Sequence, residues 1–193
     1  GTYALEYIKW GEKQGYHKRP TCASRPRWWD LGMWKISKNI LPMFERERNY
    51  CFYNECNSFI DAALYWCYSQ EDTIKLNILL NSMLFKLWKE LLSRPPEGGG
   101  GGPIQMKVYH YNEMLLPIDF INSKLSSDVI KIHQDFINRE IHDIFEELGF
   151  PKCNQKNCKH PEHPYEYVKP EEVSFDRIMP DRRELDKIVF EAL

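Results

Sequence analysis

The chain has 193 residues, of which 42% are hydrophobic and 14% aromatic, and its formal net charge is −2. This composition excludes an intrinsically disordered chain, and no apolar run approaches the roughly 20 residues that a membrane-spanning helix needs. The length suffices for one ordinary hydrophobic core with a small appendage.

The first 50 residues differ in charge from the rest of the chain. They carry ten Lys or Arg and five Asp or Glu, a net charge of +5, so residues 51–193 hold −7. A basic segment rich in Trp and Tyr suits a phosphate backbone, whose contacts supply much of the affinity for nucleic acid. A charge-separated, solvated surface would give the same counts.

Within this segment, residues 24–32 combine cations with large aromatic side chains. Arg25 and Arg27 flank a proline and run directly into Trp28 and Trp29. Arginine matches phosphate oxygens or a guanine edge, and tryptophan offers a face for stacking. The alternative is a surface turn with half-buried tryptophans and solvated arginines. As further DNA-phosphate contacts we predict Lys18, Arg19, Lys35 and Lys107.

Residues 3–68 are expected to be rich in β-strands. Dense aromatic runs cover residues 3–10, 50–53 and 59–66, and Asn and Ser punctuate them. The run over 59–66 also fits a helix.

The remainder contains three amphipathic patterns. Apolar spacing predicts long helices over residues 72–92 and 124–148, the first with Asp72 as N-cap, and a final helix over 181–193. Between the long helices, five glycines (98–102) precede a predicted strand over 104–111. The glycines fit either a hairpin tip that approaches a phosphate backbone or a plain linker.

One Cys/His cluster has spacing compatible with zinc. Its four members are Cys153, Cys158, His160 and His163. Thiolates and imidazoles bind zinc tetrahedrally, and four protein ligands would make the site structural. The alternative is a Cys/His-rich surface loop. The chain has six cysteines and no evident signal peptide, so we expect reduced thiols and a cytoplasmic location.

Catalytic motifs are missing. The five glycines follow a predicted helix and precede a predicted strand, the reverse of the strand–glycine loop–helix unit that binds a nucleotide cofactor. No nucleophile–base pair can be assigned. We therefore expect that this chain alone is not a catalyst.

The order of several short motifs resembles the target-recognition domain of N6-adenine DNA methyltransferases of the TaqI-like C-terminal specificity type. The motifs are Trp10-Gly11-Glu12, the block from His17 to Gly32, Leu80-Asn81-Ser82-Met83-Leu84, the glycine run with Met106-Lys107-Val108-Tyr109, Leu116-Pro117-Ile118, and Pro180 to Asp186. Trp29 stands where the family's block usually has tyrosine.

The resemblance implies an α+β fold, with a curved mixed β-sheet and peripheral helices. It implies a DNA target-recognition core over residues 1–121, followed by a C-terminal helical extension over 122–193. The partners it implies are double-stranded DNA and a methyltransferase catalytic domain, in the same or a partner chain. That domain would bind S-adenosylmethionine and methylate a flipped adenine. The Asn/Asp-Pro-Pro-Tyr/Phe element that such methylation needs is missing from this chain, since the Pro-Pro pair at 95–96 lacks both flanking residues. Two alternatives stay open: a protein-interaction module of a multisubunit complex, and an RNA-binding domain.

Overall fold

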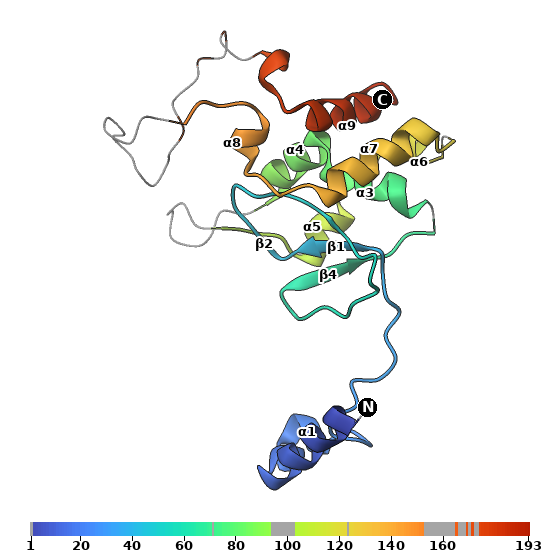
Figure 1. Ribbon diagram of the computed structural model, residues 1–193, viewed down its shortest axis with the longest axis vertical. Coiled ribbons are helices and arrows are strands. Elements are labelled where there is room, and N and C mark those ends of the chain that lie inside the picture. The colour runs from blue at the N-terminus through green and yellow to red at the C-terminus, as the bar shows by residue number, and fades with distance from the viewer. Residues whose placement is uncertain are drawn as a thin grey trace. The chain divides into compact units, whose positions relative to one another are not determined.

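The computed structural model divides the chain into two compact units, the N-terminal unit Gly1–Lys35 and the C-terminal unit Ile36–Leu193. Figure 1 shows the elements of both units. The structure describes residues 2–70, 72–93, 103–122, 124–152, 165, 169, 171 and 174–193. The mixture of helices with small antiparallel sheets confirms the α+β class.

The N-terminal unit is helical. It consists of α1 (Thr2–Lys13), a 3-10 helix η1 (Tyr16–Lys18), α2 (Pro20–Ala23) and a final stretch without helix or strand. The strand expected over residues 3–10 is therefore wrong. Its aromatic residues recur at helical spacing, and the rings of Tyr7 and Trp10 stack with centroids 5.4 Å apart. Helical periodicity thus outweighs the strand preference of single aromatic residues.

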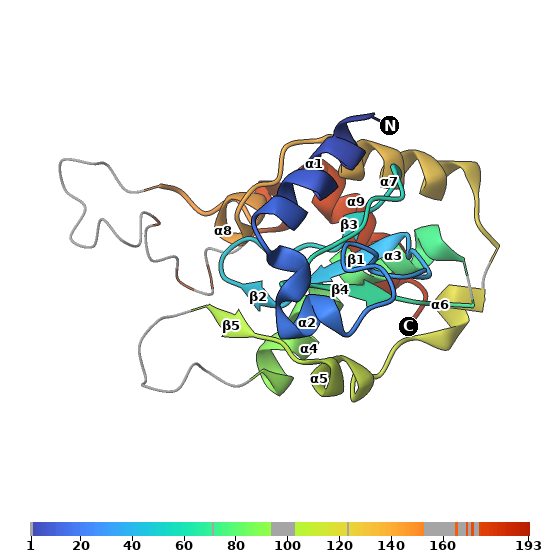
Figure 2. The same ribbon diagram turned by 90° about the horizontal axis from the view of Figure 1, so that it is seen from below.

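The C-terminal unit contains two small antiparallel sheets. The first has the order β3-β1-β4, from β3 (Phe52–Tyr53), β1 (Asn39–Pro42) and β4 (Leu64–Cys67). The second pairs β2 (Phe44–Glu45) with β5 (Ile104–Gln105). Figure 2 shows β3, β1 and β4 side by side. The strands predicted over 50–53 and 59–66 are confirmed in part, and that over 104–111 is confirmed only for its first two residues.

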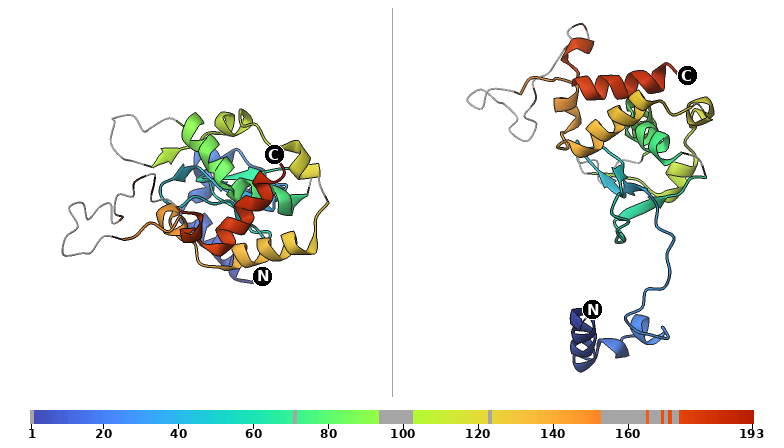
Figure 3. Two further views of the ribbon diagram at one scale, coloured as in Figure 1. Left: turned by 90° about the horizontal axis from the view of Figure 1, so that it is seen from above. Right: turned by 45° about the vertical axis from the view of Figure 1, so that its right-hand side comes forward.

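The helices of this unit lie on one side of the strands (Figures 1 and 3). They are α3 (Thr73–Asn81), α4 (Met83–Leu92), α5 (Val108–Asn112), α6 (Ile118–Asn122), α7 (Ser127–Asn138), α8 (Ile144–Glu147), the 3-10 helix η3 (Phe175–Arg177) and α9 (Pro180–Phe190). Helix α9 packs against α7, α3 and α4. Helix α9 confirms the final helix predicted over residues 181–193. Helix α5 occupies the second half of the strand predicted over residues 104–111.

The helix predicted over residues 72–92 is two helices. Asp72 caps α3 as expected, since its carboxylate accepts hydrogen bonds from the N–H groups of Ile74 and Lys75. The break lies at Ser82, whose backbone is extended with φ −72° and ψ 158°. The Ser82 hydroxyl caps α4 by accepting from the N–H of Phe85. A side-chain oxygen thus replaces the helical hydrogen bond lost at the break.

The helix predicted over residues 124–148 is likewise divided. Helix α7 ends at Asn138, and α8 begins only at Ile144, where the Asp143 carboxylate accepts from the N–H of Glu146. Arg139 follows α7 with an extended backbone, φ −84° and ψ 166°. Its guanidinium binds Asp181 and Glu147, so tertiary ion pairs replace a further helical turn.

Helix α3 is the centre of the core because every residue from Lys75 to Asn81 is buried. Leu76 and Leu80 belong to a cluster under the sheet, with Leu41, Cys51, Phe85, Met106 and Met114. Ile78 and Leu79 belong to a second cluster, with Phe120, Leu185 and Val189. A helix surrounded by apolar contacts is typical of a protein interior. Residues before and after position 121 thus pack in the same cluster. The predicted division into a DNA target-recognition core over 1–121 and a helical extension over 122–193 stays a prediction.

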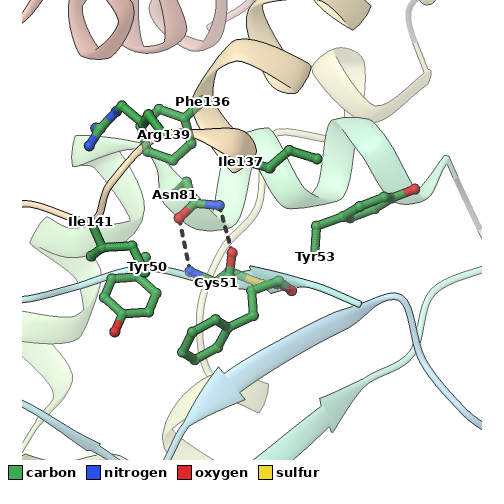
Figure 4. A pocket seen from close by; sticks show the side chains of 9 residues that line it. Tyr50, Cys51, Tyr53, Asn81, Phe136, Ile137, Arg139 and Ile141 are labelled. Carbon is green, nitrogen blue, oxygen red and sulfur yellow. Dashed lines mark hydrogen bonds between the residues drawn. The ribbon is translucent and has the colours of Figure 1, made fainter. Parts of the chain in front are cut away.

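Side-chain amides connect α3 to Cys51, the residue that precedes the edge strand β3. The Asn81 Oδ1 accepts from the backbone N–H of Cys51 at 2.8 Å, and its Nδ2 donates to the Cys51 carbonyl at 3.0 Å (Figure 4). The carboxamide thereby forms the two hydrogen bonds that a neighbouring strand would form. Asn77 extends the network by donating to the Asn39 Oδ1 at 2.8 Å. All three asparagines are buried, so the network must be internally satisfied.

His133 on α7 completes this network. Its Nε2 lies 3.1 Å from the Asn77 Oδ1, and its ring meets Tyr53 edge to face. The Asn77 Nδ2 is used as a donor, so its oxygen is an acceptor and the His133 Nε2 carries the proton. Burial lowers the pKa of His133 from 6.5 to about 4, although Asp72 acts in the opposite direction. The imidazole is therefore neutral at pH 7.

Two buried ion pairs secure the helices. Lys89 Nζ on α4 lies 2.9 Å from Glu45 Oε2 on β2, and Arg182 Nε on α9 lies 2.6 Å from Glu147 Oε2 on α8. The Arg182 guanidinium also donates to the carbonyl of Asn81 at the end of α3. Removing one partner of such a pair leaves an uncompensated buried charge, which strongly destabilises a fold.

Replacing Asn81 with Ala should lower the free energy of unfolding by about 3 kcal/mol, because the buried Cys51 N–H loses its acceptor. Urea unfolding followed by circular dichroism measures this change. The matched control is Asn138→Ala, an exposed asparagine whose amide donates to the Gln134 carbonyl. It should change stability by less than about 0.5 kcal/mol. Equal losses in the two variants would show that the Asn81 pairing is unimportant.

His133 should make the fold sensitive to acid. Its folded pKa of about 4 lies below the ordinary 6.5, so between these values the unfolded chain binds a proton that the folded chain excludes. Stability from this group is therefore complete above pH 6.5 and falls by up to about 3 kcal/mol as the pH drops to 4.

The test compares wild type with His133→Phe, which retains a ring against Tyr53 and does not titrate. Carboxylates contribute equally to both proteins, so they cancel in the difference between the two unfolding free energies. Wild type should lose stability relative to the variant from pH 6.5 to 4. A difference that is constant over this range would refute the assignment.

Candidate nucleic-acid interface

The N-terminal unit holds seven of the eight residues predicted to bind DNA. Between Gly1 and Lys35 the sequence has seven Lys or Arg and three Asp or Glu, which gives a net charge of +4. Lys107 lies in the C-terminal unit, where it is exposed and precedes α5. The structure does not place it relative to the other seven.

Trp28 packs onto α1. Its indole lies over Gly11, where an added Cβ would be only 2.5 Å from the Trp28 Cη2. Its Nε1 donates to the Glu12 Oε1 at 3.3 Å, which ties the chain after α2 back to α1. Trp28 is half-buried, in agreement with the alternative that this tryptophan packs in a core. Gly11 is required here for close approach of a ring.

The residues after Trp28 form a tight turn. Asp30 Oδ1 accepts from the backbone N–H of Gly32 at 2.9 Å, and Gly32 has a positive φ of 82°. This is the side-chain turn that Asp favours, followed by a conformation that suits glycine. The Trp34 indole donates to the Leu31 carbonyl at 2.7 Å. Local hydrogen bonds therefore hold a segment that has no regular secondary structure.

Arg25 and Arg27 lie together at an open hollow in this surface. The hollow has a volume of about 500 Å³ and is also lined by Pro26, Asp30 and Gly32. Two arginines and one aspartate belong to the lining, so its net charge is positive. The Arg27 guanidinium lies 5.6 Å from the ring centroid of Trp29, which is 42% exposed. A cation beside an exposed aromatic face can bind phosphate and stack on a base.

A second cation–aromatic contact lies beside the first helix. The Arg19 guanidinium lies 4.4 Å from the ring centroid of Tyr16, and Tyr16 meets Trp10 edge to face. Lys18 and Lys35 are exposed. Sequence reasoning missed Tyr16, although its position two residues before Lys18 in a basic segment was a usable signal.

The predicted zinc ligands Cys153, Cys158, His160 and His163 lie outside the described residues. A structural zinc therefore remains a prediction from the sequence. None of the helices in the described parts of the chain has the length and apolarity to span a bilayer.

Comparisons of the chain with protein-family models, with curated proteins and with solved structures gave no match. The functional argument therefore rests on the chemistry of the residues and on the order of the sequence motifs.

Replacing Gly11 with Ala should destabilise the N-terminal unit, although the same change stabilises most helices by about 1 kcal/mol. The added methyl group would displace the Trp28 ring. Near-UV circular dichroism and tryptophan fluorescence report that displacement. In the double variant Gly11→Ala/Trp28→Ala the alanine at 11 should no longer be harmful, as expected for two residues in contact. Additive effects of the two substitutions would exclude the contact.

Proposed function

We propose that this chain is the DNA target-recognition part of a site-specific N6-adenine DNA methyltransferase. The observation that supports this best is the hollow lined by Arg25 and Arg27, because it combines two arginines in a basic unit with an exposed tryptophan beside the Arg27 guanidinium. Arginine is the side chain that most often reads guanine in the major groove, and it also binds phosphate. The motif order of the sequence points to the same function.

The proposed division of labour gives DNA reading to this chain and chemistry to another domain. A methyltransferase catalytic domain, in the same or a partner chain, would bind S-adenosylmethionine and methylate the flipped adenine. The proposal includes a cytoplasmic location, and a curved sheet with peripheral helices as the finer architecture. Within this scheme Lys18, Arg19, Lys35 and Lys107 contact phosphates, and their contribution is independent of base sequence.

A protein-interaction module is the second candidate, and a surface of α1 favours it. Tyr3, Tyr7 and Trp10 follow one another along the helix and are 85%, 65% and 45% exposed. Exposed aromatic residues at helical spacing fit a partner's groove. Binding through this surface should depend little on salt, whereas DNA binding should weaken steeply as salt rises.

The double variant Arg25→Ala/Arg27→Ala should bind short mixed-sequence duplex DNA about tenfold more weakly than wild type, as measured by fluorescence anisotropy. The salt dependence should also become shallower, with the slope of log K against log salt reduced by up to about 2. Single-stranded RNA serves as competitor, and preference for RNA over the duplex would favour the RNA-binding alternative.

The matched control is Arg177→Ala/Lys187→Ala, which removes the same charge from the exposed surface of the C-terminal unit. It should leave affinity and salt slope near the wild-type values. Equal losses in the two double variants would reduce the effect to net charge and overturn the proposed role of the hollow.

A further inference from the structure

Helix α1 of the N-terminal unit carries a stripe of exposed aromatic side chains along its twelve residues. Tyr3, Tyr7 and Trp10 are 85%, 65% and 45% exposed, and the rings of the last two stack on each other. Their spacing of four and then three residues is that of the core positions of a coiled coil. In such a helix, residues at this spacing face a second helix. The stripe therefore has the pattern of a helix–helix interface.

The N-terminal unit lacks the usual sources of stability for its size. Folded units of fewer than about 40 residues usually need a disulfide, a metal ion or association with another chain. In the described part of Gly1–Lys35, Cys22 is a free thiol and no group of metal-binding side chains is present. Association is therefore the remaining means of covering its apolar surface.

The charges beside the stripe favour a second copy of the same helix. Glu6 and Lys13 lie on one flank of the stripe, are exposed, and form no ion pair with any described residue. In coiled coils, charges at such flanking positions determine partner and orientation. If two copies of α1 pack antiparallel, with Tyr7 of each against Trp10 of the other, then Glu6 of each lies beside Lys13 of the other.

A parallel arrangement does not offer these pairs. The opposite flank of the stripe carries Ala4 and Gly11, which have no charge. In a parallel pair of helices the charged flank of one helix faces the opposite flank of the other, so Glu6 and Lys13 would both lack a partner. The charge pattern is thus complementary to itself in the antiparallel orientation alone.

We propose that α1 is a dimerisation helix, whose aromatic stripe packs antiparallel on α1 of a second copy of this chain. The six rings of the two copies bury roughly 800 Å², whereas stable specific interfaces bury about 1,200–2,000 Å². The dimer is therefore weak and reversible, with a Kd of about 10–100 μM. The inference does not rest on the proposed binding of DNA, so Arg25→Ala/Arg27→Ala should dimerise like wild type.

The test is sedimentation equilibrium of the whole chain over a series of concentrations, at about 0.15 M salt. The Debye length is then about 8 Å, so the like net charges of two units are screened while charges in contact still attract. Wild type should pass from monomer to dimer as its concentration rises. A chain that stays monomeric up to about 1 mM would overturn the proposal.

Two charge reversals identify the interface. Glu6→Lys sets positive charges opposite each other in the dimer, and Lys13→Glu sets negative ones, so each variant alone should dimerise at least about tenfold more weakly. An equimolar mixture should regain the wild-type affinity, because each positive flank then meets a negative one. This recovery also requires that both variants are folded. Reversals without effect, or a mixture without recovery, would overturn the antiparallel pairing.

Matched controls lie on the C-terminal unit. Glu184→Lys and Lys131→Glu reverse exposed charges that form no ion pair with a described residue, so each variant and their mixture should dimerise like wild type. Tyr7→Ala removes the centre of the stripe and should weaken dimerisation at least about tenfold. Phe175→Ala, at a position that is 78% exposed, should have no effect. Equal losses in these last two variants would overturn the assignment of the interface to α1.

Discussion

The C-terminal unit depends on the pairing of one side-chain amide with one backbone peptide. Asn81 supplies Cys51, just before β3, with the two hydrogen bonds of a strand neighbour, and it does so from the last turn of a helix whose residues 75–81 are all buried. Edge strands expose unpaired N–H and C=O groups that must be satisfied when they are buried. Because Asn77 and His133 bond to the same network, the sheet, α3 and α7 are held in register by polar groups of fixed geometry. The apolar clusters supply most of the stabilisation, and the amides determine which packing is adopted.

The same region explains the break between α3 and α4. Arg182 takes the carbonyl of Asn81, and Asp186 Oδ1 accepts from the Met83 N–H at 2.7 Å. Both backbone groups would otherwise be exposed by the interruption at Ser82. Helix α9 thus supplies hydrogen-bond partners to the backbone on both sides of the break. It also fixes Arg139 through Asp181. Arg139 borders the small cavity between β3 and the end of α7. The C-terminal segment is therefore part of the fold on which the cavity depends.

Sequence reasoning succeeded where the determining contacts are local. The Asp72 cap and the final helix both follow from residues a few positions apart. It failed where the determining partner is distant: the break at Ser82 depends on residues 101 and 103 positions away from the groups they bind. The small cavity between β3 and α7 could not be predicted for the same reason, because Tyr50 and Phe136, which both line it, come together only in the fold. The strand expected over residues 3–10 failed differently, because single-residue preference was given more weight than helical spacing.

The N-terminal unit illustrates how a short segment can order an arginine pair. A unit of this size, Gly1–Lys35, buries little apolar surface, and many of its aromatic side chains remain exposed. Its order comes from specific contacts: an indole against Gly11, the bond from Trp28 to Glu12, and the Asp30 turn. Each contact restricts the backbone next to Arg25 and Arg27. Immobilising a long side chain costs about 0.5–1.5 kcal/mol when a partner binds, and ordering a loop adds to this cost. A backbone that is already restricted loses less conformational entropy on binding. In the proposed complex with DNA, Trp28 would therefore favour binding by restricting the segment that carries Arg25 and Arg27.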